Sequence, residues 1–464
     1  MTLVPEIDGE RLLGRLDAFA RIGATPAGGV NRQAFSIEDR SARRLLAELA
    51  LERGFAVFQD AMANLFIRRE GTDATLPPLL IGSHLDSQPT GGRFDGALGT
   101  LSAFETLEAV EDAKVETRMP IEVVAWANEE GSRFAPGVMG SMAFTGADIS
   151  AWQSIVGSDG ASLAEELAAT ISALPEATLR PLGMPISGYI ELHIEQGPSL
   201  EKERLPIGVV TAVQGTRWLE VSIEGAAGHA GTTGLAYRRD PMVAAVAAMH
   251  RLQTTVMPLD SSARLTVGRV TAKPGSINAI PQSVAFAVDI RHPRVERLDA
   301  IEAETRQVCA AEAGAQHCTA MIRRSFDMPG AAFSPDMVKT VEEAVNSLRL
   351  PHKQMISGAF HDALFLARVA PAAMIFVPCR EGLSHNEAEY VEPAYAVTGA
   401  RVLLKAAIAA ASLDDSRHCS GRLIAMRSVS SGGGRHSCLP PCPCTNKPCS
   451  CVLTALVGVR KMDE

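Results

Sequence analysis

The sequence predicts an α/β domain with a mainly parallel sheet, interrupted by a smaller inserted α+β domain of the ferredoxin-like type. Three features of the chain lead to this fold class. Four short apolar runs lack polar alternation, as strands buried on both faces do. Segments with apolar residues at helical spacing lie between these runs. A middle stretch instead alternates apolar and polar residues, which is typical of strands with one exposed face.

The outer parts of the chain supply the elements of the α/β domain. Residues 38–53 have helical spacing and end before Gly54, a residue type that commonly stops a helix. The apolar runs predicted as buried strands are LPPLLIGS (76–83), MPIEVVAWA (119–127), GYIELHI (188–194) and AAMIFVP (372–378). Further helices are predicted over 97–112 and 161–173. This alternation of strands and helices predicts a layered α/β domain.

The middle of the chain has a different texture. Alternating strands are predicted in RWLEVSIEG (217–225), RLTVGRVTA (264–272) and SVAFAVDIRH (283–292), with helices over 240–253 and 295–313. The order strand, helix, two strands, helix and strand is that of a small open sheet covered on one face. We therefore expect one domain built from residues 1–212 and 329–412, and an inserted domain from 213–328.

Composition excludes several classes of protein. The chain has 464 residues, of which 46% are hydrophobic and 21% charged, so it is not disordered, collagen-like or a coiled coil. A net charge of −9 argues against nucleic acid or an anionic membrane as a partner. The sequence contains neither an apolar run long enough to span a bilayer nor a basic-then-apolar leader, so we expect a cytoplasmic protein.

Residues 413–464 form a tail of unusual composition. Six of the nine cysteines lie there, in segments such as SSGGG and PPCPCTNKPCSC. One hypothesis is a zinc or copper thiolate site, but the cysteine spacings do not repeat a paired C-x-x-C pattern. The sequence favours a disordered appendage, such as the product of an altered reading frame at the end of the gene.

Residues that commonly bind metals follow each of the four buried strands. They are His84 and Asp86 with Asp95 in the next loop, Glu129 and Glu130, His193, and His385. The carboxyl ends of parallel strands meet at one edge of a sheet, so these side chains should converge. Imidazoles and carboxylates together suit divalent metals such as zinc.

The spacing within these motifs also suggests how the side chains divide the work. In an extended His-x-Asp segment the two side chains face the same way, so Asp86 could orient His84 through its second ring nitrogen. Glu129 and Glu130 are adjacent and point differently. One of them could bind metal while the other faces a metal-bound water.

Longer motifs strongly resemble the amidase/hydantoinase/carbamoylase family, which belongs to the di-metal aminoacylase and carboxypeptidase-type hydrolases. They are IGSHLDSQPTGGRFDGALG, WANEEGSRFAPGVMGS, ELHIEQGP, GHAGTTG, PGSINAIP, DIRHP and IFVPCREGLSHNE. The resemblance runs from about residue 9 to residue 411. It implies a di-metal catalytic domain, with the insert acting as a lid and dimerisation domain.

The resemblance also implies roles for individual residues. Asp95 would bridge two divalent metals, with His84 and His193 completing one site and Glu130 and His385 the other. Zinc is expected first, and manganese, cobalt or nickel could also bind. Glu129 would be the general base. His229, Asn278 and Arg291 would contact substrate, and Gln196, Arg217 and His361 are further contact candidates. In the family the histidine matching His229 comes from the neighbouring subunit, which implies a homodimer.

The expected activity is hydrolysis of an N-carbamoyl-L-amino acid to the amino acid, carbon dioxide and ammonia. Allantoate hydrolysis and β-ureidopropionase activity are alternatives with the same chemistry. A metal-binding module without catalysis is a third reading, against which the intact Glu129 and the complete ligand set argue.

The sequence departs from the family pattern at two positions, of which the second bears on the substrate. Gly234 replaces a usual proline, and Phe360 replaces a glycine typical of its turn. At Phe360 we expect strain from a positive φ and added bulk close to the substrate.

Overall fold

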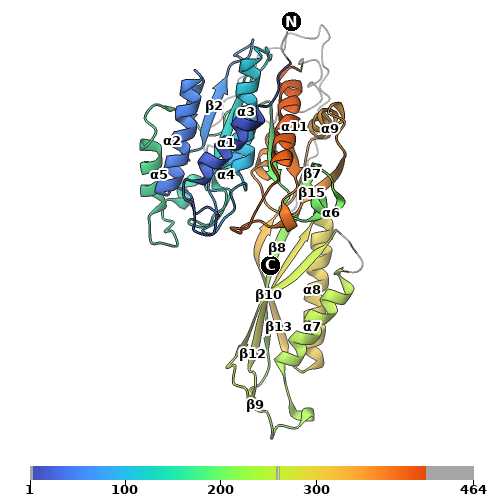
Figure 1. The fold of residues 1–464 in the computed structure, drawn as a ribbon. Coiled ribbons are helices and arrows are strands. Elements are labelled where there is room, and N and C mark those ends of the chain that lie inside the picture. The colour runs from blue at the N-terminus through green and yellow to red at the C-terminus, as the bar shows by residue number, and fades with distance from the viewer. Residues whose placement is uncertain (1–3, 258–259, 261, 414–464) are drawn as a thin grey trace, which may run out of the picture. The chain divides into compact units, whose positions relative to one another are not determined.

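A mixed sheet of ten strands forms the centre of the computed structural model, which describes residues 4–257, 260 and 262–413 (Figure 1). The strand order is β14-β7-β16-β6-β3-β4-β2-β1-β5, and β15 pairs with β7. The strands are β1 (Ala56–Gln59), β2 (Leu65–Arg69), β3 (Leu79–His84), β4 (Ile121–Trp126), β5 (Thr178–Leu179), β6 (Gly188–Ile194), β7 (Ile207–Val213), β14 (Ala331–Ala332), β15 (His352–Ser357) and β16 (Ala372–Val377).

The four predicted apolar runs are the four central neighbours of this sheet. They form β16, β6, β3 and β4, which pair in that order and all in parallel. Every residue in these four strands is buried. The predicted α/β class with a mainly parallel sheet is therefore confirmed. The flanking strands β2 and β7 pair antiparallel with β4 and β16, so the sheet as a whole is mixed.

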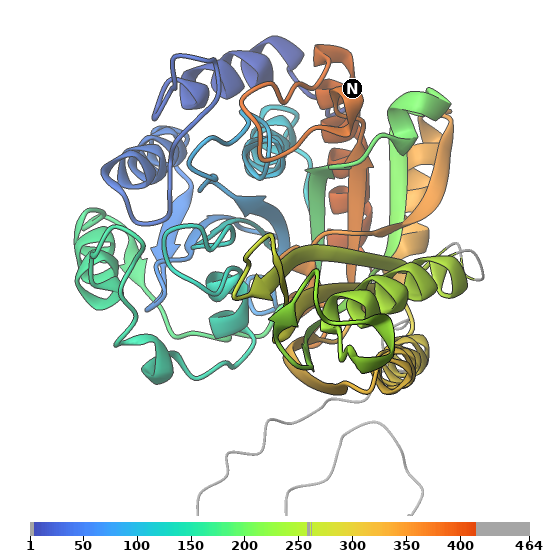
Figure 2. The same cartoon turned by 90° about the horizontal axis from the view of Figure 1, so that it is seen from below.

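Helices cover the sheet on both sides. They are α1 (Gly9–Ala20), α2 (Ile37–Glu52), α3 (Ala97–Asp112), α4 (Met139–Phe144), α5 (Leu163–Ser172), α6 (Ser199–Glu203), α9 (Pro335–Ser347), α10 (Ala363–Leu366) and α11 (Pro393–Ala411). Helices α1, α3 and α11 lie side by side in Figure 1. In Figure 2, α2 and α5 (blue and teal) lie at one side of the sheet and β7 (green) at the other.

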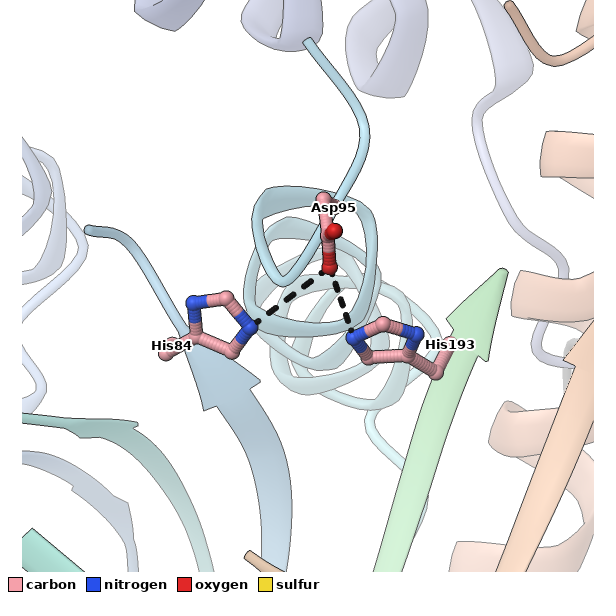
Figure 3. A group of neighbouring side chains, drawn as sticks. All are labelled: His84, Asp95 and His193. Atoms are coloured by element: carbon pink, nitrogen blue, oxygen red, sulfur yellow. Dashed lines mark ion pairs between the residues drawn. The ribbon is translucent and has the colours of Figure 1, made fainter. Parts of the chain in front are cut away.

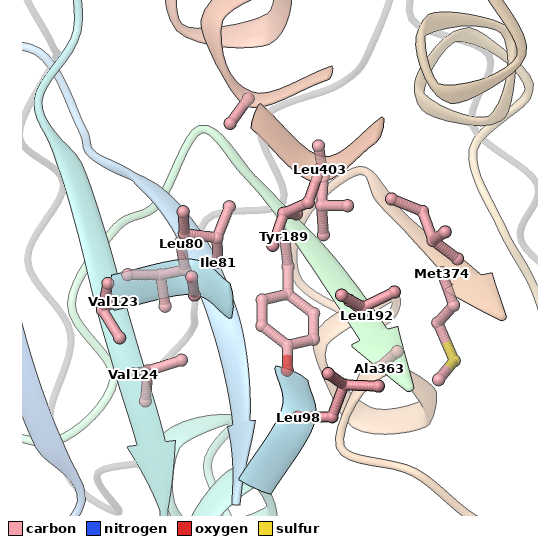
Figure 4. Close-up of a cluster of buried hydrophobic side chains, with 14 of the residues drawn as sticks. Leu80, Ile81, Leu98, Val123, Val124, Tyr189, Leu192, Ala363, Met374 and Leu403 are labelled. Carbon is pink, nitrogen blue, oxygen red and sulfur yellow. The ribbon is translucent and has the colours of Figure 1, made fainter. Parts of the chain in front are cut away.

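The main core lies where the central strands meet α3 and α11. Figure 4 shows Leu80, Val123 and Leu192 from the strands close to Leu98 and Leu403 from these helices. Helix α11 is long and apolar enough to cross a membrane by composition alone, but more than half of it is buried inside the fold. Its apolar surface is therefore that of a core helix.

A second sheet of four antiparallel strands has the order β10-β12-β8-β13. Its elements in chain order are β8 (Gly215–Glu224), α7 (Pro241–Thr255), β10 (Arg264–Lys273), β12 (Ser283–His292), α8 (Val295–Ala315) and β13 (Thr319–Met328). This is the predicted order, and both helices pack on one face over a separate core. The described residues from 4 to 413 nevertheless fall in one compact unit, so the domain boundaries stay predictions.

Two shorter segments complete the description. β9 (Gly228–His229) pairs with β11 (Ala279–Ile280) beyond the end of the small sheet. The predicted cysteine-rich tail lies outside the described residues except for Leu413, whose carbonyl accepts a hydrogen bond from Arg118. Leu413 also packs against the main core and so belongs to the body of the chain.

Candidate metal and active site

The five predicted metal ligands meet at the carboxyl ends of the four central parallel strands. They are His84 at the end of β3, Asp95 just before α3, Glu130 after β4, His193 near the end of β6 and His385 after β16. His84 and His385, which are 385 − 84 = 301 positions apart in the chain, thus reach the same edge of the sheet. The topology accounts for this, because parallel neighbours end at the same edge.

Asp95 stands between two groups of potential ligands. Its Oδ1 lies 3.1 Å from His193 Nε2 and 3.7 Å from His84 Nε2, as Figure 3 shows. Its Oδ2 lies 3.5 Å from His385 Nε2, which is 3.3 Å from Glu130 Oε2. Within each group of three, the ligand atoms all lie within 4.8 Å of one another. The arrangement fits a carboxylate shared by two cations.

Main-chain carbonyls orient the two imidazoles on one side of this cluster. His84 Nδ1 donates to the carbonyl of Asp86 at 3.0 Å, and His193 Nδ1 donates to the carbonyl of Ile194 at 3.0 Å. In the neutral form of each ring Nδ1 carries the proton, so Nε2, which faces Asp95, would have the lone pair that a metal ion needs.

The carboxylate of Asp86 has a different role from the one predicted. It lies 3.6 Å from His84 Nδ1, and accepts hydrogen bonds from the main-chain N–H groups of Glu129 (3.3 Å) and Glu130 (3.1 Å). The main-chain carbonyl of Asp86, rather than its side chain, therefore accepts the hydrogen bond from the ring. Asp86 therefore holds the segment that carries both glutamates.

Side chains from distant loops hold Asp95 in place. Glu389 Oε1 accepts the N–H groups of Phe94 (2.8 Å) and Asp95 (3.0 Å). Ser384 Oγ and Gln196 Nε2 donate to Asp95 Oδ2 at 2.7 and 3.0 Å. The predicted substrate residue Gln196 thus lies in the cluster, where its amide already has two polar partners.

Sequence reasoning missed three of these supporting residues. Glu389 and Ser384 hold Asp95, and Gln88 Nε2 donates to Glu130 Oε2 at 2.7 Å. All three lie within or next to motifs that were singled out for other residues. A further signal was Glu191, an isolated charge inside the buried strand GYIELHI.

The site concentrates buried negative charge. Burial raises the pKa of Glu129 and that of Glu130 well above the usual range, and neighbouring carboxylates, Asp362 for Glu129 and Asp95 for Glu130, raise them further. Burial lowers the pKa of His84 to about 4, which keeps its imidazole neutral. Glu129 Oε2 lies 3.6 Å from His84 Nε2. Carboxylates and imidazoles in this arrangement favour bound cations.

His361 lies behind His193 rather than in the open part of the site. Their ring centroids are 4.5 Å apart, and His361 is buried. With Glu191 the two histidines form a third group of potential ligand atoms. However, His361 Nε2 is hydrogen-bonded to Ser357 Oγ at 2.9 Å, and Glu191 accepts Ser83 Oγ at 2.8 Å. Both residues therefore support His193 from within the protein.

Arg217 is surrounded by acidic side chains. Its guanidinium lies 3.0 Å from Asp327, 2.6 Å from Asp299 and 3.3 Å from Glu302. Its side chain is buried, and these carboxylates occupy its donors. The predicted substrate contact would have to displace one of them, which the sequence did not indicate.

Arg291 has a more accessible guanidinium. It pairs with Asp289 at 2.9 Å and donates through Nη1 to the carbonyl of Gly358 at 2.8 Å. Close by, Phe360 does not have the positive φ that we expected, so its phenyl ring causes no backbone strain there. The turn is built with an ordinary conformation at this position, and the predicted strain is wrong.

His229 and Asn278 lie together but away from this cluster. His229 is in β9 and Asn278 immediately precedes β11, and Ala230 N–H donates to the Asn278 carbonyl at 3.0 Å. Strand β7 of the large sheet ends at Val213, and strand β8 of the small sheet then runs from Gly215 to Glu224 before the chain reaches them. At ~3.3 Å per residue, this strand alone spans roughly 30 Å. The chain does not bring His229 to its own metal ligands.

Comparison with known proteins agrees with this geometry. The model of peptidase family M20/M25/M40 matches residues 80–409, which include all five ligands. The chain belongs to peptidase family M20/M25/M40. Members of this M20 family depend on metals, and the groups around Asp95 are candidate ligands.

Individual relatives within the M20 family cover nearly the whole body of the chain. An N-carbamoyl-L-amino-acid amidohydrolase from Rhizobium meliloti is 39% identical over 88% of this chain and 97% of that protein. A ureidoglycolate hydrolase from Arabidopsis thaliana is 32% identical over 86% and 85%. A solved hydantoinase/carbamoylase-family amidase from Burkholderia multivorans has a TM-score of 0.84 at 42% identity, over 88% and 99%. This M20 protein is therefore a hydrolase of carbon–nitrogen bonds in the hydantoinase/carbamoylase group.

Proposed function

We propose that this chain hydrolyses N-carbamoyl-L-amino acids to the free amino acid, carbon dioxide and ammonia. The observation that carries the proposal is the convergence of the five ligands with Glu129 beside them. Greater identity to the N-carbamoyl-L-amino-acid amidohydrolase than to the ureidoglycolate hydrolase, 39% against 32%, favours this substrate.

Two divalent cations fit the residues that are present. His84 and His193 would hold one, Glu130 and His385 the other, and Asp95 would contact both. The raised pKa values of Glu129 and Glu130 reflect buried carboxylates crowded together, a charge that cations would offset. Histidine and carboxylate donors suit zinc first, with manganese, cobalt and nickel as alternatives.

When bound, such cations lower the pKa of water and polarise a carbonyl group. Glu129 performs the proton transfer in this proposal. Its carboxylate accepts a proton from the attacking water and returns it to the departing nitrogen, so the carbon–nitrogen bond breaks without an unstable amide anion. The buried position next to His84 suits this task, because proton transfer there does not compete with bulk water.

Arg291 and His229 complete the proposed site. The guanidinium of Arg291 would bind the substrate carboxylate with paired hydrogen bonds. His229 and Asn278 would approach from a second copy of the chain, with His229 donating to the developing oxyanion.

The surface of the small sheet supports a homodimer. β10 is an edge strand with one side unpaired among the described strands, and α7 exposes Val243 and Val246. Sedimentation equilibrium should give twice the chain mass of 49.2 kDa. A complementation test is sharper. Mixed Glu129→Gln and His229→Ala chains should regain about a quarter of the activity, because each mixed dimer has one intact site. Absence of any rescue would place His229 outside the partner's site.

A substrate panel tests the activity itself. Metal-stripped protein is reloaded with zinc, manganese, cobalt or nickel, and ammonia release is followed with carbamoyl-L-amino acids, carbamoyl-β-alanine and allantoate. We expect the fastest turnover with a carbamoyl-L-amino acid and none without metal. Preference for allantoate or carbamoyl-β-alanine would replace the proposed substrate. Bound metal without turnover of any ureido acid would indicate a non-catalytic module.

We also propose that the protein acts in the cytoplasm.

A further inference from the structure

Three aromatic rings form a continuous row between the two sheets. Trp218 on β8 stacks on Phe326 of β13, with ring centroids 4.5 Å apart and an angle of 29°. Phe326 in turn contacts Phe360, which follows β15, with centroids 6.0 Å apart. β8 and β13 are neighbours in the small sheet, whereas β15 belongs to the large one. The row therefore links the small sheet to the loop at the metal ligands.

One end of this row precedes a residue of the candidate metal site in the sequence. Phe360 immediately precedes His361, whose ring is in contact with His193. His193 Nε2 is 3.1 Å from Asp95. Phe360 is therefore the neighbour in sequence of His361, and the ring of His361 packs on the proposed metal ligand His193.

The other end of the row is tied to Arg291. Asp289 Oδ2 accepts hydrogen bonds both from Trp218 Nε1 (3.1 Å) and from Arg291 Nη2 (2.9 Å). The indole and the guanidinium are therefore held by one oxygen atom. In an α-amino acid, carboxylate and side chain are attached to the same carbon. A carboxylate bound at Arg291 consequently directs the substrate side chain towards these rings.

Part of the apolar surface of the three rings is exposed to solvent. Trp218 is 44% exposed, and Phe326 and Phe360 are only half-buried. Aromatic surface of this kind gains from contact with another apolar group.

We propose that Phe360, Phe326 and Trp218 receive the substrate side chain and select aromatic or large apolar N-carbamoyl-L-amino acids. The inference rests on the proposed carbamoyl-amino-acid hydrolysis. It names the class of side chain that the same site accepts. Small side chains leave the rings uncovered, and carboxylate side chains meet the negative faces of the rings unfavourably.

Steady-state kinetics of the metal-loaded protein tests the inference. kcat/KM is measured for carbamoyl-L-phenylalanine, carbamoyl-L-aspartate and carbamoylglycine, which has no side chain. The native chain should prefer the phenylalanine derivative over the other two by about tenfold or more. Phe326→Ala and Phe360→Gly should each lose about tenfold on this substrate, and change less than twofold on carbamoylglycine.

Met321→Ala is the matched control. Met321 is an exposed side chain of the same strand as Phe326, paired with Ser222 further along the small sheet. It should leave all three substrates unchanged. An equal loss on every substrate, or a gain on the phenylalanine derivative in Phe360→Gly, would overturn the inference while leaving carbamoyl hydrolysis intact. Failure of the native chain on all carbamoyl-amino acids would overturn both.

Discussion

Two adjacent glutamates face different partners in the metal site. Glu130 Oε2 lies 3.3 Å from His385, whereas Glu129 Oε2 lies 3.6 Å from His84. Asp86 accepts hydrogen bonds from the main-chain N–H groups of both glutamates. The fixed backbone, and not the choice of side-chain rotamer, therefore directs the two carboxylates to different partners. One carboxylate can therefore serve as a ligand while its neighbour transfers protons.

Glu129→Gln separates metal binding from proton transfer. The amide keeps the size of the carboxylate but cannot accept the water proton at neutral pH, so kcat should fall by ~10³-fold. Metal content measured by atomic absorption should stay the same as in the native chain. A variant that retains native turnover would refute Glu129 as the base.

Glu389 holds the loop of Asp95 by accepting two N–H groups. Glu389→Ala should weaken zinc binding by ~10–100-fold and the metal-free fold by about 2 kcal/mol, because two buried donors lose their acceptor. Burial raises the pKa of Glu389 to about 8. Glu389→Gln, which keeps an acceptor oxygen, is therefore the matched control and should stay close to the native chain. Chelator competition and calorimetry measure both effects, and equal behaviour of the two variants would contradict this role.

A charge cluster joins helices α1 and α3. Glu105 and Glu108 on α3 are buried, and Arg11 and Arg15 on α1 pair with them. Such a cluster fixes the position of α3, whose first residue follows the Asp95 loop. Packing of α1 against α3 thereby supports the metal site at the N-terminal end of α3.

Arg15→Met should destabilise the fold by about 3 kcal/mol, since it leaves buried carboxylate charge with fewer partners. Lys339→Met is the control, because Lys339 and Glu343 form a solvent-exposed ion pair. This exposed pair should change stability by less than about 0.5 kcal/mol. Urea unfolding compares the two, and equal effects would show that the α1–α3 cluster contributes no more than a surface pair.

The turn between β1 and β2 makes stability depend on pH. Burial raises the pKa of Asp60 to about 6, although Asp60 accepts hydrogen bonds from Met62 and Asn64. A carboxyl with a raised pKa stabilises the fold fully below its unfolded value, near 4, and this contribution is lost as pH rises through 6.

Asp60→Asn removes this titration. The free energy of unfolding of the native chain minus that of the variant should therefore fall by roughly 2–3 kcal/mol between pH 4 and pH 7. Urea unfolding at both pH values measures it, and Asp73→Asn at an exposed position should not show the fall. A constant difference would mean that Asp60 does not change its protonation on folding.

The chain as a unit should function without its last residues. The family match ends at residue 409, and the Rhizobium meliloti relative covers 88% of the chain. A chain ending after Leu413 keeps the contacts of that residue with the core. Its kcat/KM and melting temperature should match those of the full chain, apart from changes below twofold and ~2 °C. A large loss of either would show that residues 414–464 contribute to the fold or the site.

The sequence predicted the central strands and their ligands well, for a physical reason. Strands buried on both faces are continuous apolar runs, and parallel neighbours end at one edge. The helix expected over 97–112 has the bounds of α3. The antiparallel strands β2 and β7 were not predicted, because an apolar run as short as LFI (65–67) or IGVV (207–210) does not by itself distinguish a strand from a helical segment. The fold class could therefore be predicted from the periodicity of apolar residues, whereas the number of strands in the sheet could not.

The sequence by itself determined which residue types stand at the strand ends. The motifs and their spacing were also sufficient to identify the family. Only the tertiary structure decided their partners. It gave the ring of His84 a main-chain carbonyl of Asp86, bound Arg217 to three carboxylates, and brought Glu389 to Asp95 across 294 residues of chain. Local spacing sets the direction of a side chain, but its partners depend on segments that packing alone brings near.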